Sequence, residues 1–296
     1  MRTNLTSQIT LNRVSTKYYK PENAVERSVL TRFEKVPTDI YESVDEGVAH
    51  IANEIAGRIQ DRQREGKFFV IGAGTGASLR PLYAELVRKH KDEGLSFRNV
   101  VIFNLYEYYP LAPESAGSSF TQLKDLFVDQ IDIDKQNVFT IDGSIPQEAI
   151  LEYCRLYEQR LQTFGGMDIV LMGIGREGNI AMNEPGSNLN SPTRLILMNA
   201  TSKAEAGHNL GIDNLPPCSI TMGVSTIMGA RKIYLLAWGE NKADIIRKAV
   251  EEKVSDTLPA SYLQMHNNVN VCIDLSAAAH LTRIQRPWLV TNCEWN

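Results

Sequence analysis

A glycine-rich stretch at residues 173–186 holds the chain's densest group of side chains that could transfer protons. It follows an apolar run, residues 168–172, of the kind that forms a buried parallel strand. Ligands of open α/β sheets bind beyond the carboxyl ends of the strands, so we predict a functional loop at this position. The loop carries two carboxylates and two carboxamides: Glu177, Asn179, Asn183 and Glu184.

The glycines of this stretch also have the spacing of a dinucleotide-binding fingerprint. Gly173, Gly175 and Gly178 match its pattern. That fingerprint must open a helix, whose amino end holds the pyrophosphate. Pro185 and Gly186 would break such a helix almost at once. We therefore interpret the stretch as a loop that carries acid and base groups.

A second glycine-rich turn, residues 72–78, joins an apolar run at residues 68–71 to a helix expected over about residues 79–90. Glycines let backbone N–H groups approach an anion, hydroxyl side chains add donors, and the following helix points its positive end there. We predict that this turn binds a phosphate group. The binding residues would be Gly74, Thr75, Gly76, Ala77 and Ser78.

Two alternatives to a phosphate site remain open for this turn. A dinucleotide would require an acidic residue about 20 positions on, near the end of the next strand. That strand, residues 100–103, is followed by Asn104, Leu105 and Tyr106, and no carboxylate occurs before Glu107. The other alternative is a tight turn that binds no ligand.

Strands and helices alternate along most of the chain. Ser43 and Glu46 have the form of a capping box, and apolar residues at helical spacing follow them to residue 59. Unbroken apolar runs separated by helices predict an α/β fold: one doubly wound, mostly parallel sheet with helices on both faces. The expected strands are residues 68–71, 100–103, 138–141, 168–172, 194–197, 232–237 and 269–273.

The predicted domain covers residues 37–285. Residues 1–36 form an N-terminal extension, with a short helix over about residues 24–33, that packs either on this domain or on a partner subunit. Residues 286–296 form a C-terminal tail. Whether this tail continues into a further domain of a longer natural chain is left open.

Composition excludes several classes of protein. The 296 residues have a net charge of −4, so a nucleic-acid partner is not expected. No apolar run is long enough to span a bilayer, and the polar N-terminus has no signal core. The four cysteines are scattered, and Cys272 lies in an apolar run typical of a buried free thiol. We expect a cytoplasmic protein without metal or cofactor.

Six short segments, all in the same order, resemble the glucosamine-6-phosphate deaminase/isomerase family, a relative of the 6-phosphogluconolactonases. The resemblance covers about residues 38–275 and implies an open α/β sheet. It also implies conversion of an amino sugar phosphate to a ketose phosphate with release of ammonia. The segments are residues 75–78 with Tyr83, 103–108, 173–185, 221–224, 239–243 and 263–266.

The resemblance implies that two lysines help the turn at residues 75–78 to hold the phosphate. Lys242 matches the family pattern, whereas Lys203 stands where the family usually has arginine. Lysine keeps the charge there but loses the bidentate geometry of a guanidinium group. For either lysine, a solvated surface charge is the alternative.

The chain departs from the family at two catalytic positions. The family has an aspartate base where this chain has Tyr106, and a histidine where it has Asn179. A phenol with a pKa near 10 is a poor base at neutral pH, and asparagine cannot transfer a proton. Glu177 stands where the family has an aspartate, and Glu184 matches the family.

Three carboxylates remain as candidate acid or base groups. They are Glu177, Glu184 and, if the loop directs it to the site, Glu107. The alternative for the first two is that their carboxylates only accept hydrogen bonds from loop N–H groups.

Three hypotheses about function follow. The chain is an enzyme acting on glucosamine 6-phosphate or a related hexose phosphate, with Glu177 or Glu184 transferring protons. Alternatively, it binds a phosphorylated sugar without turnover, as a sensor or a regulatory domain. NAD-linked redox chemistry through the two glycine loops is the third. Homo-oligomerisation is left open.

Overall fold

A seven-stranded parallel sheet forms the centre of the molecule in a computed structural model, which describes residues 14–290 apart from residues 116 and 213. The strand order is β1-β10-β9-β6-β2-β3-β5, and all neighbouring pairs are parallel. This confirms the predicted α/β class. The strands are β1 (Thr38–Tyr41), β2 (Phe69–Ala73), β3 (Val100–Asn104), β5 (Val138–Phe139), β6 (Ile169–Met172), β9 (Ile233–Ala237) and β10 (Val269–Asp274).

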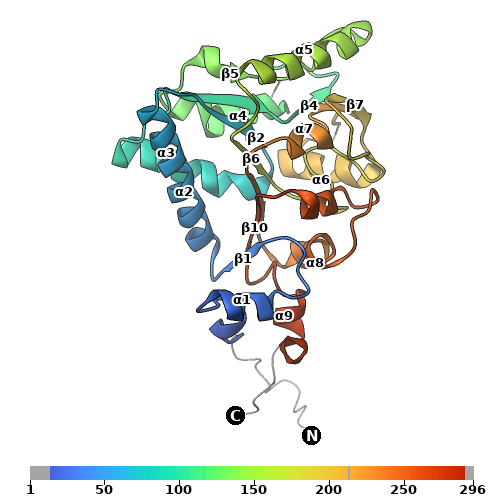
Figure 1. Cartoon of the computed structure of the whole chain (residues 1–296). Coiled ribbons are helices and arrows are strands. Elements are labelled where there is room, and N and C mark those ends of the chain that lie inside the picture. Colours follow the sequence, from blue (N-terminus) through green and yellow to red (C-terminus); the bar gives the residue numbers. More distant parts are fainter. Residues whose placement is uncertain (1–13, 116, 213, 291–296) are drawn as a thin grey trace, which may run out of the picture.

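Helices cover both faces of the sheet (Figure 1). Two separate clusters of buried apolar side chains, one on each face, form the core. One cluster includes side chains of α2 (Val44–Arg64), α3 (Arg80–Glu93) and α4 (Ser119–Leu126), and the other includes those of α5 (Ile150–Thr163) and α8 (Ala243–Glu251). Helix α2 begins as predicted, with the Ser43 side chain accepting a hydrogen bond of 3.2 Å from the Glu46 N–H.

A second sheet of three antiparallel strands, in the order β4-β8-β7, lies beside the first. It consists of β4 (Tyr106–Tyr109), β8 (Cys218–Thr221) and β7 (Arg194–Leu197), and α6 (Ala200–Leu210) and α7 (Val224–Met228) follow β7 and β8. The strand predicted at residues 194–197 therefore exists, but its assignment to the parallel sheet is wrong. Its residues are half-buried or exposed, whereas a strand covered on both faces would be fully buried.

The described part of the N-terminal extension packs on its own domain. Helix α1 (Ala24–Leu30) lies beside α9 (Thr282–Gln285) at one end of the molecule (Figure 1). There Arg283 Nε lies 2.7 Å from Glu34 Oε1, and both side chains are almost fully buried. Residues 1–13 and 291–296 are outside the described residues, and the domain boundaries at residues 36 and 286 stay predictions.

Two expectations from composition concern residues that the structure describes. Cys272 lies buried in β10 as a free thiol, which confirms that expectation, and Cys154 and Cys218 are free as well. Cys293 falls outside the described residues. Within residues 14–290, none of the helices combines the length and the apolar character that crossing a bilayer would require.

The strand order changes direction at β2, which pairs with β3 on one side and with β6 on the other. Such a switch point opens a crevice at the carboxyl ends of the strands. Side chains pack directly over the glycine in this part of β2, because a Cβ atom on Gly72 would lie 2.5 Å from Met167 Sδ. This first glycine of the predicted turn thus has a packing role.

The buried carboxylate of Asp168 fixes β6 against β2. Its Oδ2 accepts a hydrogen bond of 2.9 Å from the Val70 N–H, and its Oδ1 accepts hydrogen bonds from the Arg62 and Arg231 guanidinium groups. Asp168 lies at the amino ends of the two strands, whereas both glycine-rich turns follow their carboxyl ends. By fixing the pairing of β6 with β2, it helps to set the relative position of the two turns.

We expect Asp168→Ala to lower the free energy of unfolding by about 3 kcal/mol, because it leaves a buried N–H and two guanidinium groups without their acceptor. Urea denaturation followed by circular dichroism measures this loss. Asp125→Ala, at an exposed position on α4, is the control and should change stability by less than about 0.5 kcal/mol. Equal stability of the two variants would contradict a structural role for Asp168.

Candidate active site

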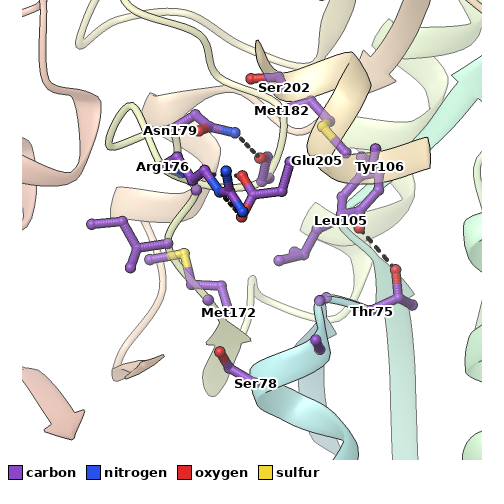
Figure 2. Close-up of a pocket in the computed structure, with 18 of the residues that line it drawn as sticks. Thr75, Ser78, Leu105, Tyr106, Met172, Arg176, Asn179, Met182, Ser202 and Glu205 are labelled. Carbon is purple, nitrogen blue, oxygen red and sulfur yellow. Dashed lines mark hydrogen bonds and ion pairs between the residues drawn. The ribbon is translucent and has the colours of Figure 1, made fainter. Parts of the chain in front are cut away.

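A cavity of about 410 Å³ opens at the switch point, beyond the carboxyl ends of β2 and β6. All five residues of the predicted phosphate turn, 74–78, line it. Residues of the second glycine-rich stretch form the facing wall, and α6 contributes Ser202 and Glu205 (Figure 2). The structure therefore brings together the two motifs that the sequence analysis identified separately.

The turn at residues 74–78 is held rigidly by side chains around it. The Trp238 indole N–H donates to the Ser78 carbonyl oxygen at 2.8 Å, and the Tyr83 hydroxyl donates to the Gly74 carbonyl oxygen at 2.6 Å. A short 3-10 turn (Ala77–Leu79) leads directly into α3. The α3 end points its positive dipole to the cavity. The Leu79 and Arg80 N–H groups donate within the 3-10 turn and Pro81 has none, so hydrogen-bond donors for an anion would come from earlier residues of the turn.

Three cationic side chains line the cavity. Lys242 is 9% exposed, and its ammonium group donates to the Ile174 carbonyl oxygen at 2.9 Å and to Glu205 Oε1 at 3.0 Å. Arg80 and Arg176 are the other two. The described lining residues therefore hold more cationic side chains than carboxylates, of which Glu205 is one.

The structure does not bring Lys203 to the cavity wall. This residue lies on α6 and is half-buried, between Ser202 and Glu205, which do line the cavity. Successive residues of a helix are about 100° apart around its axis, so only some positions of α6 face the cavity.

Tyr106, at the position of the family's aspartate base, is tied to the phosphate turn. Its hydroxyl oxygen lies 2.9 Å from Thr75 Oγ1 (Figure 2). Thr75 Oγ1 in turn lies 2.8 Å from Ser119 Oγ. Burial raises the pKa of the Tyr106 phenol above its ordinary value of about 10. The hydroxyl therefore stays protonated at neutral pH and positions the turn.

Asn179, at the position of the family's histidine, lines the cavity and packs against Gly175. A Cβ atom on Gly175 would lie 1.9 Å from Asn179 Oδ1, so only glycine fits there. Ala181, two residues after Asn179 in the same wall, has a left-handed backbone with φ of 48°, a conformation that non-glycine residues rarely adopt. The loop is thus shaped around the Asn179 carboxamide.

A hydrogen-bonded network joins Glu177 and Glu184 just behind the cavity wall. The Asn199 carboxamide donates to both carboxylates, at 2.7 Å to Glu184 Oε2, while its oxygen accepts from the Ser202 N–H and caps α6. Ser202 Oγ also donates to Glu184 Oε2, at 3.0 Å. The two carboxylates are not part of the lining, but Ser202 is, so Glu184 lies one hydrogen bond from the cavity.

The environment of Glu184 favours its protonated form. Burial raises the pKa of this carboxyl group, although the hydrogen bonds from Ser202 and Asn199 partly oppose the increase. Its second oxygen, Oε1, is buried and accepts no hydrogen bond from the described residues. A carboxyl group whose pKa lies closer to neutrality is better suited to proton transfer.

Glu107, the third candidate acid or base group, lies away from the cavity at the start of α4. Its carboxylate accepts four hydrogen bonds, from the N–H groups of Tyr108, Ser119 and Phe120 and from the Ser118 hydroxyl, at 2.6–3.0 Å. Burial raises the pKa of Glu107, while these hydrogen bonds lower it. The geometry gives this side chain a structural role as an acceptor for the first N–H groups of α4, beside the N-cap residue Ser118.

Several cavity residues were absent from the candidates that the sequence suggested. Arg80 follows the phosphate turn directly and Arg176 lies inside the second glycine-rich stretch, so their positions carried a signal. Ser202 and Glu205 lie on a helix without a recognisable motif, and only the fold brings them to the cavity. In the described part of the chain, no group of three or more His, Cys, Asp or Glu side chains is placed to hold a metal ion.

The fold and the cavity together define an α/β protein with a crevice lined by cationic side chains at the switch point of its sheet. Residues 42–272 match the family described as glucosamine-6-phosphate isomerases/6-phosphogluconolactonase. Because this match covers most of the chain, the chain belongs to that family.

Individual relatives agree with this assignment. The chain is 63% identical to a glucosamine-6-phosphate deaminase-like protein of Bacteroides thetaiotaomicron over 100% of its own length but only 45% of the relative's. It is 37% identical to glucosamine-6-phosphate deaminase 1 of Bacillus subtilis, covering 77% of this chain and 94% of that one.

Solved structures show the same fold. A monomeric glucosamine-6-phosphate deaminase superposes with a TM-score of 0.77 at 32% identity, covering 82% of this chain and 99% of that one. The 6-phosphogluconolactonase of Trypanosoma brucei superposes with a TM-score of 0.67 at 19% identity, covering 84% and 99%, which supports the fold alone.

We expect Glu107→Ala to lower the free energy of unfolding by about 2–4 kcal/mol, because three N–H groups and a hydroxyl lose their shared acceptor. Thermal and urea unfolding measure the loss, with the exposed Glu114→Ala as the control. Unchanged stability combined with lost turnover would instead give Glu107 a catalytic role.

Proposed function

We propose that this chain binds a phosphorylated amino sugar in the cavity and acts on it as a deaminase/isomerase, converting glucosamine 6-phosphate or a related hexose phosphate to the ketose phosphate. One observation carries the proposal. The turn at residues 74–78 and the ammonium group of Lys242 line the same cavity at the switch point of the sheet. Relatives named as glucosamine-6-phosphate deaminases support the same substrate class.

The phosphate group would lie at the N-terminal end of α3. There it would accept hydrogen bonds from backbone N–H groups of the turn and from the Ser78 hydroxyl, with Lys242 and Arg80 balancing its charge. The sugar would extend toward the loop that holds Asn179, because that loop forms the opposite wall. A carboxamide there can hydrogen-bond sugar hydroxyls as both donor and acceptor.

Proton transfer would involve Glu184. Its raised pKa suits a group that exchanges protons near neutral pH, and Ser202 connects it to the cavity. The Asn199 carboxamide donates hydrogen bonds to both Glu184 and Glu177. The Glu177 carboxylate would therefore orient Asn199, and through it Glu184.

Binding without turnover is the second candidate function, and Tyr106 favours it. The phenol at the position of the family's base is protonated and hydrogen-bonded to Thr75, so it cannot accept the proton that an aspartate would take. Asn179 cannot replace a histidine in proton transfer either. The chain would then recognise a phosphorylated sugar as a sensor or regulatory domain.

One pair of measurements distinguishes these functions. Purified protein is incubated with glucosamine 6-phosphate, and both ammonia and fructose 6-phosphate are assayed. Calorimetry with the same compound measures binding. Release of both products supports the enzyme, whereas binding without either product supports the second function. Absence of binding to any hexose phosphate would remove both.

We expect Lys242→Ala to weaken binding of glucosamine 6-phosphate by about 10–100-fold, because a charge-assisted hydrogen bond contributes about 1.5–3 kcal/mol. Binding of free glucosamine should change by less than about threefold. Calorimetry measures both, and Lys253→Ala, an exposed lysine outside the cavity, is the control. Equal weakening for the two sugars would show that Lys242 does not bind the phosphate.

If the chain turns over glucosamine 6-phosphate, we expect Glu184→Gln to reduce kcat by about 10²–10⁴-fold, since the amide cannot exchange the proton. The amide keeps its acceptor oxygen for Ser202 and Asn199, so the Kd for the substrate should stay within about threefold. An unchanged kcat would remove Glu184 from proton transfer. The exposed Glu240→Gln is the matched control.

A further inference from the structure

A carboxylate lies among the cations of the cavity wall. Glu205, on α6, accepts a hydrogen bond of 3.0 Å from Lys242 Nζ through Oε1 and one of 3.1 Å from the Arg176 backbone N–H through Oε2. Figure 2 shows Glu205 beside Arg176 in the middle of the cavity lining. A negative charge at this place opposes the binding of a phosphate group.

We propose that Glu205 is an internal counter-anion that competes with the phosphate of the ligand for Lys242, and that it thereby sets the affinity and selectivity of the cavity for anions. This inference rests on the proposed function, because the competing anion is the phosphate of the bound sugar. A phosphate that approaches Lys242 must either displace Glu205 or bind beside a second negative charge.

The burial of the pair makes this competition strong. The Lys242 side chain is 11% exposed and that of Glu205 is 19% exposed, so water screens their attraction only partly. Lys242 also donates to the Ile174 carbonyl oxygen at 2.9 Å, which keeps its ammonium group in place whichever anion it meets. Separating the pair therefore leaves each side chain with another partner, because Glu205 Oε1 also lies 3.9 Å from Arg176 Nε.

A role for Glu205 in binding the amino group of the sugar is the main alternative. The geometry favours the counter-anion, because both carboxylate oxygens already accept hydrogen bonds from two different segments of the chain. The Arg176 guanidinium also lies near Glu205, with Nε 3.9 Å from Oε1, so two cations already flank this carboxylate and disfavour a further ammonium group.

The test measures the affinity of inorganic phosphate and of glucosamine 6-phosphate by calorimetry. Glu205→Gln removes the charge and keeps the shape of the side chain. We expect both compounds to bind about tenfold more tightly, as for a partly buried ion pair worth about 1.4 kcal/mol. Glu240→Gln removes the same charge from an exposed residue two positions before Lys242, and affinity should change less than twofold.

A double variant tests whether Glu205 acts through Lys242. Replacing both, as Glu205→Gln with Lys242→Ala, should abolish the tenfold gain relative to Lys242→Ala alone. A gain of equal size without Lys242 would overturn the proposal. Thermal unfolding checks that each variant is folded, and Glu205→Ala, which removes the same charge, replaces Glu205→Gln if the latter is unstable.

The remaining outcomes separate this inference from the proposed function. Equal binding by the unaltered chain and Glu205→Gln overturns the inference and leaves the proposed function standing. Binding by Glu205→Gln alone supports the inference and contradicts the proposed function. If neither binds either compound, both fail. Weaker binding of glucosamine 6-phosphate, with unchanged binding of inorganic phosphate, would assign Glu205 to the amino group and overturn the inference.

Discussion

The hydrogen bond from the Gly74 N–H to the Leu171 carbonyl oxygen, 2.9 Å long, joins the two strands on which the cavity depends. It closes the pairing of β2 with β6 at the carboxyl ends, directly before both glycine-rich turns begin. The approach is so close that a Cβ atom on Gly74 would lie 3.1 Å from the same carbonyl oxygen. Since the turns diverge from this point, one wall of the cavity follows β2 and the facing wall follows β6.

This constraint explains which features could be predicted from the sequence. Buried parallel strands leave long apolar runs, and their carboxyl ends lie at one edge, so both polar, glycine-rich turns were expected at that edge. They converge because β2 and β6 are neighbours, which the sequence did not reveal. Lys242 joins them for the same reason, because it follows β9, the neighbour of β6. The family pattern and the order of the strands therefore both put Lys242 near the turn at residues 74–78.

Other features depend on contacts that no local pattern records. The strand at residues 194–197 has ordinary strand composition, and only its pairing with β8 places it in the small antiparallel sheet. Glu107 was a candidate base only if the loop directed it to the site. Contacts with the start of α4 hold its carboxylate there instead, as alternation along β4 also indicates. Glu205 reaches the cavity through the rotation of α6, which spacing along the sequence does not reveal.

The polar groups of the cavity wall are largely paired with one another. Thr75 bonds to Tyr106, Lys242 pairs with Glu205, and Glu184 bonds to Ser202. Binding a sugar phosphate then exchanges internal hydrogen bonds for new ones, so the net gain is smaller than the number of contacts suggests. Charge is a separate point. A neutral phenol at position 106 would not repel a phosphate dianion bound at the turn, whereas the family's aspartate would place a negative charge near it. Under the proposed function, tyrosine at position 106 would thus favour anchoring of the phosphate, and proton transfer would take place on the Glu184 side of the cavity.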